Sequence, residues 1–156
     1  MFEIDSRFIP FILLPFVGWG ITWWLRRKNE YTTLKKCTLK IGLIAFFLTE
    51  IARSFYRPYI YQNHLFDYYI SDTIGNSLGT VTIIFMILTI SGKGTRDDWK
   101  MIVLSTAGLI GYEMINLLTD YPFDYRDVVA TLLFGSLSFL LYFHLLKTYQ
   151  KKTKTK

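Results

Sequence analysis

Five stretches that are nearly free of charged residues dominate this chain of 156 residues, and each is about 14–20 residues long. A helix rises about 1.5 Å per residue, so these stretches match the roughly 30 Å hydrocarbon core of a bilayer. A water-soluble domain of this length has no interior that could bury five such helices. The pattern therefore predicts an all-α polytopic membrane protein, a bundle of five transmembrane helices. We expect the spans at residues 8–25, 39–53, 74–91, 99–118 and 128–146.

The charge pattern excludes several other classes of protein. The net charge is +6, but the basic residues flank the apolar stretches and do not form a separate basic domain, so we expect no nucleic-acid partner. A soluble enzyme, a disordered chain and a disulfide scaffold are also excluded. The single cysteine, Cys37, lies in a lysine-rich stretch and is predicted to be a free thiol.

The distribution of charge between loops predicts the orientation in the membrane. Residues 26–40, residues 92–100 and the segment after residue 146 hold 14 of the 18 Lys and Arg residues. The opposite side holds nine of the twelve acidic residues. The positive-inside rule then places the N-terminus outside and the C-terminus in the cytoplasm. We predict a multi-pass protein of the bacterial cytoplasmic (inner) membrane, with one transmembrane domain over 1–146 and a basic cytoplasmic tail over 147–156.

The first apolar stretch is interpreted as a retained span. Its basic cluster, Arg26 to Lys28, follows the apolar residues, whereas a signal peptide carries its basic residues before them. No cleavage site of small residues follows the stretch either.

Two parts of the chain resemble each other. Each has a glutamate in an outgoing helix (Glu50 or Glu113), an outer loop that ends in Phe-Asp-Tyr (66–68 or 123–125), and a returning helix. Both hairpins share one orientation, so the sequence indicates a lead helix followed by two parallel repeats. Gene duplication and the shared physical needs of outer hairpins both explain the match.

Aspartates stand where the third and fifth spans are expected to start. Asp72 and Asp127 could accept hydrogen bonds from the unpaired N–H groups there, which would make them ordinary helix caps. The alternative is that they belong to a site. Small residues within the two returning helices, among them Gly79 and Gly135, predict close contact between helices.

Acidic residues inside the apolar stretches are the main functional candidates. A charge at the bilayer centre costs roughly 2.5–3.5 kcal/mol on insertion scales, so Glu50 and Glu113 are expected to face protein or water. Two more polar residues follow each glutamate on the same helical face, Arg53 and Arg57 after Glu50, and Asn116 and Asp120 after Glu113.

We expect the two polar stripes to meet at the outer mouth of the bundle, with the arginines of the first contacting acids of the second or of the loops. Two interpretations stay open: buried ion pairs that hold the hairpins in register, and an outward-facing pocket for a polar or charged ligand. Such a ligand would be a lipid headgroup or a cell-surface precursor. The predicted ligand-binding residues are Glu50, Arg53, Arg57, Asp72, Asn76, Glu113, Asn116, Asp120, Arg126 and Asp127.

The second hairpin resembles the VanZ-like family of small bacterial membrane proteins. The residues that carry the resemblance are Glu113, Phe123, Arg126, Asp127, Ala130 and Gly135, with a second partial match at Glu50, Asp72, Asn76 and Gly79. The resemblance implies a function of the cell envelope connected with lower glycopeptide susceptibility, acting through cell-surface precursors or lipids. It implies no defined reaction.

Three other functions remain as alternatives. The chain could be a structural or accessory subunit of a membrane complex, or an oligomeric pore or small-solute transporter. It could also be a small membrane enzyme in which Glu113 works with Asp127 or Asp120 as an acid and base pair. No motif indicates a cofactor, and no metal is expected because His64 and His144 are predicted on opposite sides. The expected partners are membrane lipid and a membrane-complex partner or second copy of the chain.

Overall fold

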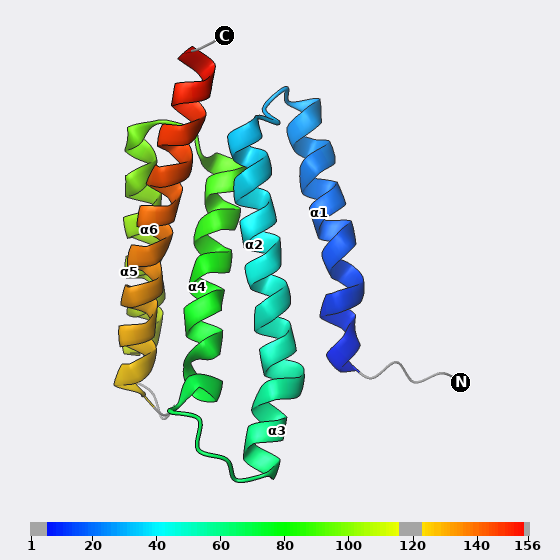
Figure 1. Ribbon diagram of the computed structural model, residues 1–156, viewed down its shortest axis with the longest axis vertical. Coiled ribbons are helices and arrows are strands. Elements are labelled where there is room, and N and C mark those ends of the chain that lie inside the picture. The colour runs from blue at the N-terminus through cyan, green and yellow to red at the C-terminus, as the bar shows by residue number, and fades with distance from the viewer. Residues whose placement is uncertain (1–5, 116–122, 155–156) are drawn as a thin grey trace, which may run out of the picture.

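The computed structural model of the protein describes residues 6–115 and 123–154, and these residues form a bundle of roughly parallel and antiparallel helices (Figure 1). The long elements are α1 (Ile9–Arg27), α2 (Thr33–Ile51), α4 (Ile70–Ser91), α5 (Trp99–Ile115) and α6 (Tyr125–Lys154). The short ones are two 3-10 helices (Ser6–Phe8 and Arg96–Asp98), a π-helical turn (Ala52–Tyr56) and α3 (Arg57–Gln62). The predicted all-α class is confirmed for the part of the chain that is described.

Three of the helices, α1, α4 and α6, are long and apolar enough to cross a membrane. α2 is less apolar because it carries lysines near its start, and the described part of α5 ends at Ile115. Large apolar side chains remain exposed on the outer faces of the bundle, for example Trp19 (70%), Leu104 (75%) and Leu140 (64%). Such a surface is unfavourable in water but matches hydrocarbon, so the structure is consistent with a helical membrane protein.

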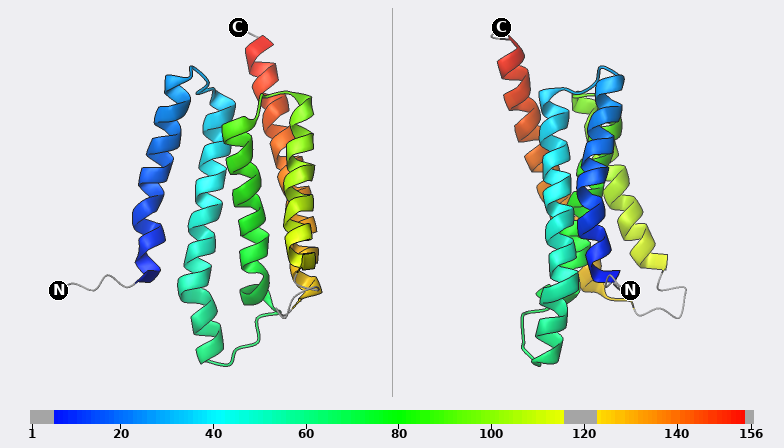
Figure 2. Two further views of the ribbon diagram at one scale, coloured as in Figure 1. Left: turned by 180° about the vertical axis from the view of Figure 1, so that it is seen from behind. Right: turned by 90° about the vertical axis from the view of Figure 1, so that its right-hand side faces the viewer.

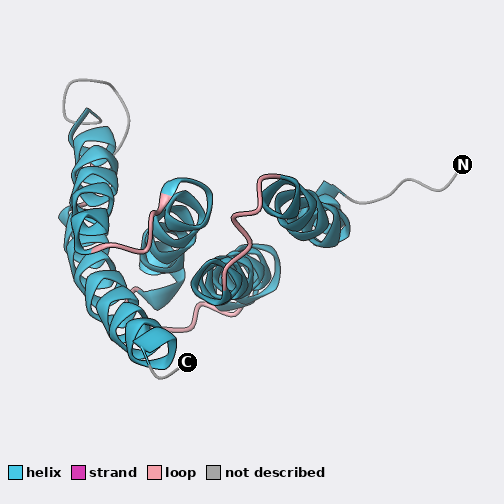
Figure 3. Cartoon of the chain, turned by 90° about the horizontal axis from the view of Figure 1, so that it is seen from above, coloured by secondary structure: helices cyan, strands magenta, loops and turns pink. Residues whose placement is uncertain are grey.

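The helices lie side by side in the order α1, α2, α4 and then α5 with α6 (Figures 1 and 3). α4 is the central helix, because it packs against α2, α5 and α6, whereas α1 packs on α2 at the edge. The two ends of the bundle differ (Figure 2). The "α3 end" holds α3 and the starts of α4 and α6, and the "basic end" holds residues 28–32 and 92–98.

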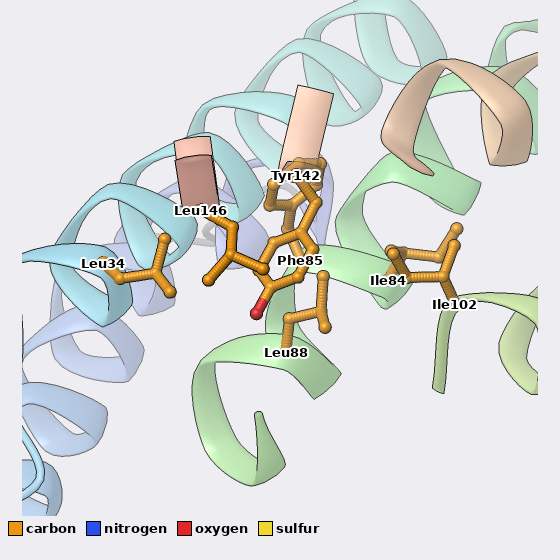
Figure 4. Close-up of a cluster of buried hydrophobic side chains, with 7 residues drawn as sticks. All are labelled: Leu34, Ile84, Phe85, Leu88, Ile102, Tyr142 and Leu146. Atoms are coloured by element: carbon orange, nitrogen blue, oxygen red, sulfur yellow. The ribbon is translucent and has the colours of Figure 1, made fainter. Parts of the chain in front are cut away.

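The buried core lies where α2, α4, α5 and α6 meet (Figure 4). Its largest members are Phe85 on α4 and Tyr142 on α6, each at most 1% exposed. Leucines and isoleucines from all four helices fill the space around them: Leu34, Ile84, Leu88, Ile102 and Leu146. This cluster ties the two hairpins together through α4.

A long helix at the α3 end replaces part of the predicted loop. The sequence predicts an outer loop from the end of the second span at residue 53 to Phe66-Asp67-Tyr68, but the helix continues from α2 through the π turn into α3 and ends at Gln62. Pro58 has no N–H to donate to the carbonyl four residues earlier, and the hydrogen-bond ladder widens just before it. The Arg57 N–H donates to the carbonyl of Ala52, five residues back.

Helix boundaries differ from the predicted spans mostly by additional turns. α2 starts at Thr33, where the Thr32 side chain accepts a hydrogen bond from the Lys35 N–H at 3.2 Å. α4 and α6 start at Ile70 and Tyr125, a few residues earlier than predicted. α6 also continues to Lys154, so most of the predicted basic tail is helical.

At the basic end, one buried carboxylate organises the connection from α4 to α5. Asp98 is 1% exposed, and its oxygens accept hydrogen bonds from the backbone N–H groups of Lys93 (3.0 Å), Gly94 (2.8 Å) and Thr95 (3.2 Å). The hydroxyl of Tyr142 on α6 donates to the same carboxylate. Asp98 therefore joins the loop to α6.

Asp98→Ala should destabilise the protein strongly, because it leaves three backbone donors and the Tyr142 hydroxyl without an acceptor. We expect a loss of about 2–4 kcal/mol, measured by thermal or denaturant unfolding in detergent. Asp97→Ala is the control, since the Asp97 side chain is 78% exposed and makes a surface ion pair with Lys100 at 3.3 Å. Equal stability of the two variants would contradict a structural role for Asp98.

The predicted close contact of small residues is confirmed at one of the two glycines. A Cβ atom at Gly135 would lie 2.7 Å from Cγ2 and Oγ1 of Thr106 on α5, so α5 and α6 approach closely there. The prediction is wrong at Gly79, where a Cβ atom would have no neighbour within 4 Å.

Gly135→Ala should weaken the packing of α5 on α6 by about 1–3 kcal/mol, because Thr106 or the helix backbone must move. Gly108→Ala is the matched control on α5, where a Cβ atom meets nothing within 4 Å. That variant should leave the melting temperature unchanged or raise it slightly. A Gly135→Ala protein as stable as wild type would show that α5 and α6 are not closely packed.

Candidate functional site

At the α3 end, an aspartate carboxylate accepts a backbone hydrogen bond at the start of both α4 and α6. The Asp67 carboxylate accepts a hydrogen bond from the Ser71 N–H at 2.7 Å, and the Asp124 carboxylate accepts one from the Arg126 N–H at 2.9 Å. Each of these aspartates is the middle residue of a Phe-Asp-Tyr tripeptide. Asp67 and Asp124 therefore both accept a backbone hydrogen bond at a helix start, but in different geometries: Asp67 bonds four residues ahead, across Tyr69, and Asp124 bonds two residues ahead from the position directly before α6.

The capping role predicted as one alternative for Asp72 and Asp127 is wrong in the described residues. Both carboxylates lie inside the first turn of their helices, and neither accepts a hydrogen bond from a backbone N–H of a described residue. Their side chains are free to contact other helices.

Asp72 joins α4 to α3. The Arg57 Nη2 atom lies 3.6 Å from Asp72 Oδ1, and the Arg57 Nε–H donates to the Tyr61 hydroxyl at 3.1 Å. The Tyr61 hydroxyl donates in turn to Asp72 Oδ1. Arg57 and Tyr61 are four residues apart, which places both on one face of α3. The three side chains form a closed network that holds α3 against the start of α4.

Asp127 brings α6 to the same place. The Asn76 side chain, one turn after Asp72 on α4, interacts with the Asp127 carboxylate, and Arg57 and Asp72 are close enough to act on it electrostatically. We call these five residues the α3-end cluster: Arg57, Tyr61, Asp72, Asn76 and Asp127. Within the described part of the chain, the buried Oδ1 atom of Asp127 has no hydrogen-bond partner.

Arg126 lies beside this cluster. Its guanidinium carbon is 3.4 Å from the centre of the Tyr69 ring, and its Nη1 atom is 3.8 Å from Asp124 Oδ2. Tyr69 adopts a left-handed backbone conformation (φ +64°) directly before α4, which is unfavourable for a bulky residue. The stacked arginine links the start of α6 to the start of α4.

The structure departs from the predicted first stripe, but it describes only Glu113 of the second stripe, so the meeting of the two stripes stays a prediction. α4 lies between α2 and α5 (Figure 1), and Arg57 pairs with Asp72 on α4. Glu50 is half-buried and Arg53 is exposed, and the side chain of neither makes an ion pair or hydrogen bond with another described residue. The π turn explains part of this difference, because one added residue rotates everything after it by about 100°.

Of the remaining predicted site residues, Glu113 is half-buried on α5. Asn116 and Asp120 lie outside the described residues, so the catalytic pairing of Asp120 with Asp127 stays a prediction. The described residues contain no group of three or more His, Cys, Asp or Glu side chains that could hold a metal ion.

Sequence reasoning missed three residues that the structure places at the site: Tyr61, Asp67 and Asp124. Tyr61 could have been found from its spacing of four residues after Arg57, if the helix had been extended past residue 53. The two aspartates could have been found from the repeated Phe-Asp-Tyr.

A shallow cavity of about 460 Å³ opens beside Tyr61 and is lined also by Ile60, His64, Leu65 and Phe66.

Comparison with known proteins finds no match to this chain, either among protein-family models, curated proteins or solved structures.

The contacts of the Asp67 carboxylate predict that the stability of the folded state depends on pH. Burial acts to raise the pKa of this carboxyl, but hydrogen bonds from the backbone and side chain of Ser71 and from Tyr56 outweigh it and hold the pKa below its ordinary value. A carboxyl with a lowered pKa stabilises the folded state above its ordinary pKa, and this stabilisation is lost as the pH falls through the lowered value.

We therefore expect the melting temperature of the wild type to fall between pH 5 and about pH 2–3 more steeply than that of Asp67→Asn. At pH 7 the variant should be the less stable protein. Thermal unfolding in detergent over this pH range measures both effects. Parallel pH profiles for the two proteins would contradict the assignment of Asp67 as the acceptor at the start of α4.

Proposed function

We propose that this chain is an integral protein of the bacterial cytoplasmic membrane whose α3 end faces outward and binds a lipid headgroup or a cell-surface precursor. The excess of acidic residues at the α3 end and of basic residues at the opposite end supports this orientation. The VanZ-like resemblance supports a role in the cell envelope, because Asp72, Asn76, Arg126 and Asp127 of its motif lie at the α3 end.

The observation that carries the proposal is the unpaired Oδ1 atom of Asp127. A buried polar atom without a partner costs about 1–3 kcal/mol, and a charged one costs more. A residue that served only to hold the helices together would be expected to have its oxygens satisfied. An acceptor kept open beside Asn76 and Arg57 fits a site that a ligand completes.

The chemistry around Asp127 indicates what the ligand carries. Asp72, Asp124 and Asp127 stand against Arg57 and Arg126, so the site has an excess of acceptors and of negative charge. A ligand with N–H or O–H donors would donate a hydrogen bond to the unpaired Oδ1 atom of Asp127. The exposed Arg57 side chain beside it could contact a phosphate of the same ligand. Ammonium headgroups and hydroxyl-rich lipid-linked precursors both have this chemistry.

A structural role is the competing explanation, and one observation favours it. An ion pair and two hydrogen bonds join the side chains of Arg57, Tyr61 and Asp72, and these contacts hold α3 against α4. This network needs no ligand. The structural explanation therefore fits Asp72, whereas the ligand explanation rests on Asp127.

Asp127→Asn separates the two explanations. If Asp127 awaits a ligand, replacing its carboxylate by an amide should leave the melting temperature of the ligand-free protein unchanged or raise it by a few degrees. The same variant should lose the rise in melting temperature that a ligand with donor groups gives the wild type. The probes are detergent micelles doped with phosphatidylethanolamine, or with a lipid-linked peptidoglycan precursor, and phosphatidylcholine is the comparison because its headgroup has no N–H donor.

Asp97→Asn, an exposed aspartate at the basic end, is the charge-matched control and should behave as wild type with every lipid. A strong drop in the melting temperature of ligand-free Asp127→Asn would support the structural explanation. Equal stabilisation of wild type by phosphatidylethanolamine and phosphatidylcholine, with no effect of the precursor, would overturn the proposed ligand class.

A further inference from the structure

A cavity of about 490 Å³ lies at the basic end, opposite the α3-end cluster. Three segments far apart in the sequence line it: the turn between α1 and α2, the end of α4 with the residues after it, and the last part of α6. Its charged residues are Lys28, Glu30, Lys35 and Lys93. The volume lies within the range of about 300–1,000 Å³ that is typical of small-molecule sites.

The cavity holds more positive charge than its own acid can neutralise. Glu30 is committed to Lys35, whose Nζ atom lies 2.6 Å from Glu30 Oε2. The hydrogen bond from Lys35 and its charge lower the pKa of the Glu30 carboxyl, so this pair stays ionised and closed at neutral pH. Two positive charges, on Lys28 and Lys93, remain.

The two remaining lysines have no acidic partner in the described part of the chain. The Lys28 Nζ atom lies 4.0 Å from the centre of the Trp24 ring, and its charge also acts on Glu30 electrostatically, but within the described residues it forms no ion pair. Among the described residues, none forms an ion pair or hydrogen bond with the Lys93 side chain. The first turn of α2, which also lines the cavity, contains no acidic residue, so the positive end of the helix dipole is not neutralised there either.

Apolar and aromatic residues form the other part of the lining: Trp24, Leu34, Leu88, Ile90, Tyr142 and Tyr149. Trp24 and Tyr149 lie where the apolar stretches of α1 and α6 give way to basic residues, which is the position of aromatic residues at a membrane interface. The site therefore combines a basic part with an apolar part at the level of the headgroups.

We propose that this cavity binds the phosphate group of an anionic phospholipid, with Lys28 and Lys93 at the phosphate and the apolar lining at the glycerol and upper acyl chains. Basic pockets between transmembrane helices recognise anionic headgroups in this way. A soluble phosphate shares the charge but not the apolar part. The lining favours the lipid, and the test includes both sources.

The test is native mass spectrometry of the purified full chain in detergent, titrated with phosphatidylglycerol, phosphatidylcholine or inorganic phosphate. Wild type should retain phosphatidylglycerol in preference to phosphatidylcholine. The double variant Lys28→Gln/Lys93→Gln should bind phosphatidylglycerol about thirtyfold more weakly, because each basic residue near an anionic lipid contributes about a factor of five. Both lysines are exposed, so the variant is expected to fold.

Lys100→Gln/Lys147→Gln is the matched control, because it removes the same charge from exposed residues at the same end that do not line the cavity. This control should bind phosphatidylglycerol within about twofold of wild type. Equal losses in the two double variants would overturn the proposal, since binding would then follow surface charge alone. Binding of inorganic phosphate with no preference for phosphatidylglycerol would overturn the lipid as the source of the phosphate.

Discussion

The long helices of the described chain satisfy their backbone polar groups internally, which is the constraint that a bilayer would impose and water does not. Helices meet this constraint individually, so the bundle can leave apolar residues such as Trp19 and Leu104 exposed and still be stable in hydrocarbon. Burial is then concentrated around α4, which packs against α2, α5 and α6. Polar contacts gather at the two ends, where Asp98 joins a loop to α6 and Asp72 joins α4 to α3.

In both repeats, the aspartate of Phe-Asp-Tyr lies at the α3 end beside the start of a helix. Asp67 and Asp124 accept the backbone hydrogen bonds at the starts of α4 and α6. Because they do so, the aspartates inside the first turns, Asp72 and Asp127, contact side chains of other helices. Asp72 is satisfied by Arg57 and Tyr61, but Asp127 keeps one open acceptor. This difference separates a structural half of the cluster from a half that fits a ligand.

The sequence alone predicts the helical class and the approximate positions of the long helices, three of which are long and apolar enough to span a membrane. It also identifies Arg57, Asp72, Asn76 and Asp127, which the structure brings together. It fails where tertiary packing decides. The stripe from Glu50 to Arg57 assumes a regular helix, but the π turn before Pro58 breaks it, and α4 lies between α2 and α5. Gly79 and Gly135 look alike in sequence, yet only Gly135 faces a neighbouring helix closely.

The central claim is that the α3-end cluster faces outward, and cysteine labelling in intact bacterial cells tests it most directly. In a Cys37→Ser background, Tyr68→Cys places a thiol at an 81% exposed position at the α3 end, and Asp97→Cys places one at the basic end. A maleimide that cannot cross the membrane should label Tyr68→Cys in intact cells and Asp97→Cys only after permeabilisation. Labelling of Asp97→Cys alone in intact cells would contradict the account.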